Sequence, residues 1–255
     1  IIGTWPLDGG DYCECEDCKD HETVFRAAMR VAEKVKEVRP DMIVEHLAYK
    51  EQTWQPPGME EIPANMSVLW TSDAGKREEL VKEWIKKSSH SSGVYQFEYN
   101  MGDNYHLRTN VWLRPDYSAG IVSHATALGF RGVISLFLPI QNRWRASFNN
   151  WFFARSCWDK DLDVPLSIKK YCKDYYGDKS GEAEEIFILF FTKLQQEPYI
   201  LPEESSKERL ANVQTVSNTI LEKLDKILGQ IKDRDVAIRF ERLKTYVEFS
   251  LLHCE

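Results

Sequence analysis

Four acidic residues lie at or near the C-terminal ends of predicted β-strands: Asp8, Glu45, Asp73 and Glu98. Hydrolysis of a glycosidic bond uses two carboxyl groups, about 5–5.5 Å apart for retention of configuration or about 6.5–9.5 Å apart for inversion. Glu98 is the strongest candidate for the general acid. Because it lies between Phe97 and Tyr99, its carboxyl group would be partly desolvated, and desolvation raises the pKa of an acid.

The three candidate catalytic acids, Glu98, Asp8 and Asp73, each have a structural alternative. Glu98 could pair with an arginine such as Arg108 and serve only the fold. Asp8 stands in a Pro-x-Asp-Gly-Gly turn and could organise that loop through Asx-type hydrogen bonds. Asp73 could cap the helix that follows it. The sequence leaves both interpretations open for each acid.

Glu45 and His46 are neighbours on a predicted strand, so their side chains point to opposite faces of the sheet. Whichever faces a ligand could hold a sugar hydroxyl or orient an acid, although a lone histidine on a strand is more often a core residue. Aromatic side chains on which a sugar ring could stack, or which could simply be packing, also lie near strand ends: Trp5, Trp70, Tyr99 and Trp112.

A Cys-x-Cys-x-x-Cys trio follows the first predicted strand. Cys13, Cys15 and Cys18 could wrap one zinc ion, with His21 in reach as a fourth ligand. Four such ligands would fill a tetrahedral site, so the zinc would be structural. The alternative is a disulfide within the trio plus one remaining thiol. Glycoside hydrolysis by two carboxyl groups requires no cofactor.

Hydrophobic patterning predicts five strands separated by helices in the first part of the chain. The expected strands are residues 1–5, 42–49, 67–71, 94–99 and 133–138, and the expected helices are 23–38, 76–87 and 116–128. Residues 50–65 contain three prolines and are expected to form a loop. Parallel pairing with right-handed crossovers is the default for such a succession.

After residue 138 the pattern becomes helical. Helices are expected near 146–158, 165–175 and 181–196, followed by two long amphipathic helices, 208–230 and 233–253, that form an antiparallel hairpin. We therefore divide the chain into residues 1–145, with the strands, and residues 146–255, an all-helical region.

Five β-α units are too few to close an eight-stranded barrel. Either the sheet is open, or the first three units of a barrel lie upstream of Ile1. Because the chain opens directly on a strand, the second alternative is favoured, and we expect the missing N-terminal part of the same protein there.

Charge and hydropathy exclude several classes of protein. The net charge is −7, with acidic and basic residues mixed along the chain, which argues against a nucleic-acid partner. No run of about 18 apolar residues is present, so no transmembrane segment is expected. A neutral or weakly charged ligand suits this composition better.

Several motifs resemble a family of mostly Bacteroidetes proteins, domain of unknown function 4838, part of which forms glycoside hydrolase family 163. The resemblance covers roughly residues 1–195. It is carried by Trp5-Pro6-Leu7-Asp8-Gly9-Gly10 before the cysteine trio, by Val94-Tyr95-Gln96-Phe97-Glu98-Tyr99, by Ala127-Leu128-Gly129-Phe130-Arg131-Gly132-Val133, and by Ala154-Arg155-Ser156-Cys157-Trp158-Asp159 leading to Tyr175-Tyr176-Gly177.

The resemblance implies the C-terminal part of a (β/α)8 TIM-type barrel, similar to the α-glucuronidase and hexosaminidase barrels, followed by a helical region. It also implies secretion and activity on β-linked N-acetylglucosamine in complex glycans. The five strands would then be the fourth to the eighth. One departure is that relatives often carry a glutamate after the last strand, where this chain has Leu136, Phe137 and Leu138.

These observations predict an extracytoplasmic glycoside hydrolase-like protein that acts on a carbohydrate substrate, with N-acetylglucosaminidase activity as the specific candidate. The alternative is a non-catalytic carbohydrate-binding protein with a degenerate site. Two carboxyl groups facing one cleft would favour the enzyme, and one alone would favour the binding protein. A third hypothesis, an assembly module that docks through its helical hairpin, requires an exposed apolar stripe on residues 208–253.

Overall fold

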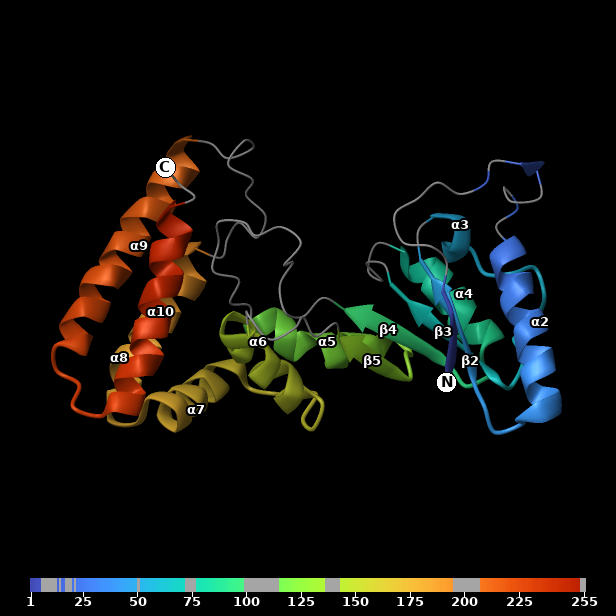
Figure 1. Ribbon diagram of the computed structural model, residues 1–255, viewed down its shortest axis with the longest axis horizontal. Helices are drawn as coiled ribbons and strands as arrows, with labels where there is room; N and C mark the ends of the chain where they lie inside the picture. The colour runs from blue at the N-terminus through green and yellow to red at the C-terminus, as the bar shows by residue number, and fades with distance from the viewer. Residues whose placement is uncertain are drawn as a thin grey trace. The chain divides into compact units, whose positions relative to one another are not determined.

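The computed structural model describes residues 1–5, 13, 15–16, 20, 22–49, 51–71, 77–98, 115–135, 143–194 and 207–252. The chain divides into two compact units (Figure 1). The first unit comprises Ile1–Glu98 and Ile121–Leu136 and contains the strands. The second comprises Tyr99–Gly120 and Phe137–Glu255 and is helical where it is described.

The first unit is built on a five-stranded sheet in which every pair of neighbouring strands is parallel. The strands are β1 (Ile2–Thr4), β2 (Val44–Ala48), β3 (Met66–Trp70), β4 (Val94–Glu98) and β5 (Gly132–Ser135), and their order across the sheet is their order in the chain. Within the described residues, the predicted five strands and their parallel direction are therefore confirmed.

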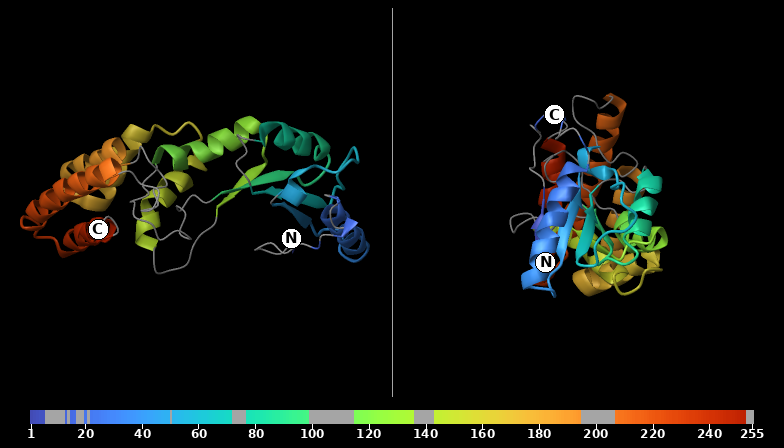
Figure 2. Two further views of the ribbon diagram at one scale, coloured as in Figure 1. Left: turned by 90° about the horizontal axis from the view of Figure 1, so that it is seen from above. Right: turned by 90° about the vertical axis from the view of Figure 1, so that its right-hand side faces the viewer.

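Helices cover one face of this sheet, which we call the helix face (Figures 1 and 2). Helix α2 (Thr23–Val38) buries Phe25, Ala28 and Ala32 against it, and α4 (Glu78–Lys87) buries Val81 and Trp84. Alternate strand residues complete this core: Val44, Ala48, Met66, Val68, Trp70 and Val94. The opposite face, which we call the far face, carries the intervening residues, among them Gly3, Glu45, Ser67, Leu69 and Tyr95.

The central strands β2 and β3 are buried at every position, whereas β1 is largely exposed and β5 partly so. Burial on both faces is typical of central strands in parallel sheets, and it explains why Met66 to Trp70 is nearly continuously apolar. Helix α5 (Pro115–Leu128) ends at Gly129, whose φ of 94° lies in the left-handed region that glycine adopts without strain.

One local prediction was wrong. The segment expected to be a loop contains a short helix, α3 (Glu51–Trp54), which lies before its first proline. The backbone carbonyl of Trp54 accepts a 2.8 Å hydrogen bond from the Trp84 indole, so this turn is tied to α4. Helix α4 begins at Glu78 with Arg77 at the N-cap, within two residues of the predicted start at residue 76, and it ends at Lys87 as predicted.

The second unit confirms the helical C-terminal region. Its helices are α6 (Arg143–Ser156), α7 (Val164–Tyr176), a 3-10 turn η3 (Gly177–Lys179), α8 (Ser180–Leu189), a π-helical turn η4 (Phe190–Leu194), α9 (Lys207–Leu228) and α10 (Arg234–Leu252). Asp163 caps α7 by accepting a 2.9 Å hydrogen bond from the Leu166 amide.

An aromatic cluster forms the core of this unit. Phe148 stacks on Phe187 with 4.6 Å between ring centroids, and Tyr176 lies 4.6 Å from Phe240. Helices α9 and α10 lie side by side (Figures 1 and 2). Their buried residues include Val213, Val216, Ile220, Leu224, Ile227, Phe240, Leu243 and Val247, so the predicted apolar faces pack within the unit.

Along the described parts of α9 and α10, no large apolar side chain is exposed. The helical hairpin therefore lacks, over these residues, the stripe that the assembly-module hypothesis requires. No helix in the described segments has the length and hydrophobicity needed to cross a lipid bilayer.

Two isoleucines on α8 test the packing of the helical core. Ile186 is fully buried, whereas Ile188 is 45% exposed. We expect Ile186→Ala to lower the free energy of unfolding by about 2–5 kcal/mol, because it leaves a cavity, and Ile188→Ala to lower it by less than about 1 kcal/mol. Urea denaturation of the two variants measures the difference, and equal losses would contradict this arrangement of the core.

Candidate functional site

The carboxyl ends of the five strands lie at one edge of the sheet, because all the strands are parallel. Ligands of parallel α/β sheets bind at this edge, where the loops after the strands can supply polar groups. Of the four acids selected from the sequence, Glu98 and Glu45 are described. Asp8 and Asp73 lie outside the described residues.

Glu98 is the last residue of β4, at the edge where the sequence placed it, and it is half-buried. The Gln96 side-chain amide donates a hydrogen bond to the Glu98 carboxylate, so the two side chains lie on the same face. Gln96 is in register with Trp70, a residue of the helix-face core. The alternation of the strand therefore assigns Glu98 to the helix face, at the outermost position of β4.

Glu45 has a different setting. It is the second residue of β2, nearer the start of the strand than the sequence suggested, and only 6% of it is exposed. Its carboxylate lies on the far face, where Oε1 accepts a 3.2 Å hydrogen bond from the Trp5 indole N–H. Burial raises the pKa of Glu45, and the hydrogen bond from Trp5 opposes this shift.

The Trp5 side chain lies just beyond the end of β1 and remains 58% exposed. The indole lies against Gly3, two residues earlier on the same face: a Cβ built on Gly3 would be 3.0 Å from the indole nitrogen. The Thr4 hydroxyl donates a 2.9 Å hydrogen bond to the Glu45 carbonyl oxygen, which adds a second link between β1 and β2.

His46 and Trp70 lie in the helix-face core. The His46 ring centroid is 5.1 Å from that of Phe25 and 5.7 Å from that of Trp84. Burial lowers the pKa of His46 to about 4, so the ring is neutral near pH 7. These positions fit packing, which was the alternative interpretation of both residues, and not contact with a ligand.

The cysteine loop is described only in part. Cys13 and Cys15 are exposed, and Cys18 and His21 lie outside the described residues, as do Tyr99 and Trp112. The zinc site and the disulfide thus both stay predictions. The described residues contain no group of three or more potential metal ligands.

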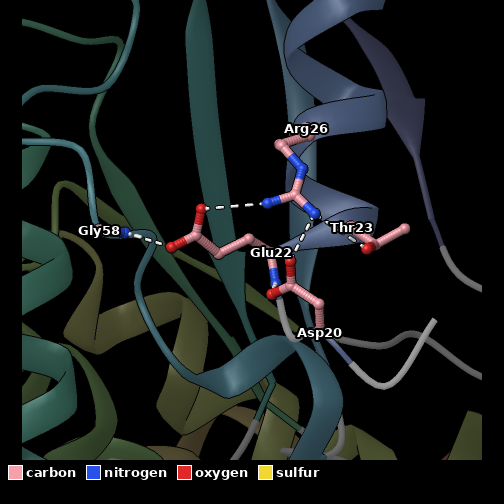
Figure 3. A network of polar contacts seen from close by, with 5 residues as sticks. All are labelled: Asp20, Glu22, Thr23, Arg26 and Gly58. Carbon is pink, nitrogen blue, oxygen red and sulfur yellow. Dashed lines mark hydrogen bonds and ion pairs between the residues drawn. The ribbon is translucent and has the colours of Figure 1, made fainter. Parts of the chain in front are cut away.

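A polar network joins the end of this loop to the segment between β2 and β3 (Figure 3). Glu22 accepts a 2.7 Å hydrogen bond from the Gly58 amide through Oε1, and its Oε2 lies 3.4 Å from the Arg26 guanidinium. Arg26 also lies 2.5 Å from the Asp20 carboxylate and 3.2 Å from the Thr23 hydroxyl. Because Asp20 and Glu22 precede α2, the network fixes where the cysteine loop ends.

Sequence reasoning missed Gly3, Ser67 and this network. The Gly-x-Trp spacing was a usable signal for Gly3, because residues two apart on a strand share a face. Ser67 is in register with Glu45, and its buried hydroxyl has no hydrogen-bond partner among the described residues. No motif in the sequence around Ser67 or Glu22 indicates that Ser67 pairs in register with Glu45 or that Glu22 bonds to Gly58.

The burial of His46 predicts a pH-dependent stability. The neutral ring is favoured in the folded protein, so stability is fully present above the unfolded pKa of 6.5 and is lost as the pH falls towards 4. We expect a loss of up to about 3 kcal/mol from this residue over that range. His46→Leu should remove it, and His90→Leu, which changes an exposed histidine, is the matched control. Urea denaturation at several pH values makes the comparison, and parallel profiles for wild type and His46→Leu would contradict it.

The Glu22 network predicts a local effect on the segment that contains Gly58. Glu22→Ala removes the acceptor for the Gly58 amide, whereas Glu22→Gln retains an oxygen at that position. We expect Glu22→Ala to increase proteolytic cleavage within residues 55–65 roughly fivefold, which corresponds to about one lost hydrogen bond. The control is Glu37→Ala at the other end of α2, where Glu37 pairs with the exposed Lys34. Equal cleavage of all variants would show that the network does not hold the segment.

Comparison with known proteins gives one family. The model of the family described as domain of unknown function DUF4838 matches residues 2–188, which is more than half of the chain. No curated protein matches. No solved structure matches either. The match includes all five strands of the sheet and α2 to α7, and the chain belongs to the DUF4838 family.

Proposed function

We propose that this protein is a glycoside hydrolase-like protein that acts on glycans, related to glycoside hydrolase family 163, with N-acetylglucosaminidase activity as the specific candidate. The observation that carries the proposal is the position of Glu98, a half-buried carboxylate at the C-terminal end of a strand in an all-parallel sheet. The active sites of barrel enzymes lie at the C-terminal ends of the strands, and Glu98 is the outermost residue of β4 at that end, although the alternation of the strand assigns it to the helix face.

The role of Glu98 would be to protonate the glycosidic oxygen as the bond breaks. A general acid must carry its proton before the reaction. The hydrogen bond from the Gln96 amide restricts the orientation of the carboxylate. A second carboxyl group could come from Asp8 after β1 or Asp73 after β3. If the substrate's own acetamide is the nucleophile, that second carboxylate needs only to orient it.

The sheet also supports the barrel part of the proposal. In a (β/α)8 barrel, neighbouring strands follow one another in the chain, all are parallel, and the helices lie outside. The order β1 to β5 and the single helix face agree with this arrangement. We propose that these strands are the fourth to eighth of such a barrel and that the protein works outside the cytosol, with zinc or a disulfide bracing the cysteine trio.

A specific observation favours the alternative, a carbohydrate-binding protein without catalytic activity. The two described acids, Glu45 and Glu98, lie on opposite faces of the sheet, so they do not form a catalytic pair with each other. The sequence also has Leu136 to Leu138 where relatives often carry a glutamate. The enzyme proposal therefore depends on Asp8, Asp73 or the substrate for the second group.

Substitution of Glu98 tests the proposal. We expect Glu98→Gln to lower turnover of an aryl β-N-acetylglucosaminide and of a complex N-glycan by about 10²–10⁴-fold, because the amide cannot transfer a proton. The fold should be retained, since an amide is easier to desolvate than a carboxylate. The control is Glu83→Gln on α4, which removes a carboxylate that is half exposed and pairs with Lys87.

The outcomes separate the two hypotheses. Unchanged turnover in Glu98→Gln, with turnover by the wild type, would remove Glu98 from the mechanism. A wild type that binds these glycans without cleaving them would favour the binding protein. A wild type that neither binds nor cleaves any glycan tested would overturn the proposal as a whole. Thermal unfolding of each variant, run in parallel, separates loss of chemistry from loss of fold.

A further inference from the structure

We propose that Trp5 is the stacking platform of a saccharide subsite on the far face, and that Glu45 acts as its positioning residue and does not itself contact the sugar. This inference rests on the proposed function for the nature of the ligand. It is carried by how Gly3, Trp5 and Glu45 fit together.

Trp5 combines exposure with fixation, which is unusual for a surface side chain. Most of its surface is in contact with solvent, yet its indole N–H is bonded to a carboxylate that is almost completely buried. Holding an exposed side chain in one conformation normally contributes little to the stability of the fold. A ring that is ordered before a ligand arrives does not lose conformational freedom on binding, so the affinity is higher.

Gly3 leaves the space in which the Trp5 indole lies against β1. The built Cβ of Gly3 would lie 3.0 Å from the indole Nε1, 3.2 Å from Cδ1 and 3.4 Å from Cε2 of Trp5. Contacts this short are tighter than ordinary van der Waals contact, so a side chain at position 3 would displace the ring by a few tenths of an ångström, whereas glycine lets the pyrrole edge lie against β1. The indole is therefore restrained by the strand on one side and by Glu45 at its nitrogen.

Glu45 is placed to act through the ring. Burying a carboxylate is costly unless it is hydrogen-bonded, and the Trp5 indole N–H supplies a hydrogen bond to it. Because Glu45 is only 6% exposed, a ligand on the surface has little access to it, whereas the ring that it holds is accessible. The carboxylate thus orients Trp5 and leaves the contact with the sugar to the indole.

The ligand class follows from the chemistry of the platform. An indole face attracts the weakly positive C–H groups on one side of a pyranose ring, and it offers no charge to an anion. The protein carries a net charge of −7, which also disfavours an anionic ligand. These properties favour a neutral sugar, and the proposed function specifies an acetamido sugar, which is the occupant to which the inference commits.

The experiment measures binding of tri-N-acetylchitotriose by calorimetry and follows the Trp5 indole N–H signal by NMR with labelled tryptophan. Trp5→Phe identifies the signal by its loss. Trp5→Ala should weaken binding about three- to tenfold, the range for one aromatic contact. The matched control is Trp158→Ala, which removes an even more exposed tryptophan from the second unit.

Three variants test the positioning role. Glu45→Gln keeps an oxygen that can accept from the indole N–H, so it should change binding less than about twofold and keep the fold, since the amide is easier to bury. Glu45→Ala and Gly3→Ala should each shift the Trp5 signal and weaken binding, by no more than Trp5→Ala does. In the Trp5→Ala background, Glu45→Ala should cause no further loss, because its effect passes through the ring.

Each outcome has one meaning. A further loss in the double variant would show that Glu45 contacts the sugar and would overturn the positioning role. Unchanged binding in Trp5→Ala would overturn the platform while leaving the proposed function intact. A wild type that binds neither this sugar nor any glycan tested would overturn the proposed function together with this inference. Thermal unfolding of the Glu45 variants identifies any that fail to fold. If one does, the effect of Gly3→Ala on the Trp5 signal and on sugar binding tests the platform in its place.

Discussion

Parallel pairing of β2 with β3 forces the connecting chain to return from one edge of the sheet to the other before β3 can begin, and the same requirement applies to every neighbouring pair. This constraint explains why long connections alternate with short strands throughout the first unit. It also brings the loops after all five strands to one edge. Trp5 and Glu98 lie at this edge because of the pairing, although they are far apart in the chain.

The packing of helices on the helix face stabilises the sheet. Trp84 connects several elements of it, because its ring packs against Phe25 and His46 while its indole N–H bonds to the backbone of Trp54. One side chain thus joins α4 to α2, to β2 and to α3. A neutral His46 is compatible with this apolar setting, whereas an imidazolium would lie in it without a partner for Nδ1 among the described residues. The buried histidine on this face therefore serves packing, and the far face carries the accessible platform.

Much of the fold could be predicted from the sequence because periodicity reports local structure. The helix expected over residues 23–38 has those bounds, and the five strands are within a few residues of their expected positions. Helix α3 was missed because the nearby prolines dominated the pattern. The site was harder to predict. Which face Glu98 occupies depends on the register of β4 with Trp70, and the contact of Trp5 with Glu45 depends on pairing across 40 positions. A local sequence pattern does not report which residues are paired across such distances in the chain.

The two outer strands of the described sheet each leave one side unpaired within it. In the described part of the sheet, β1 hydrogen-bonds only to β2, and β5 only to β4, so each presents one row of backbone groups without a strand beside it. Such rows are templates for edge-to-edge association. Here the templates are only three and four residues long, which limits the hydrogen bonds that a foreign strand can form. In the proposed barrel, these rows are where the strands upstream of β1 would pair, and β1 and β5 contain no ionisable side chain that would oppose the pairing.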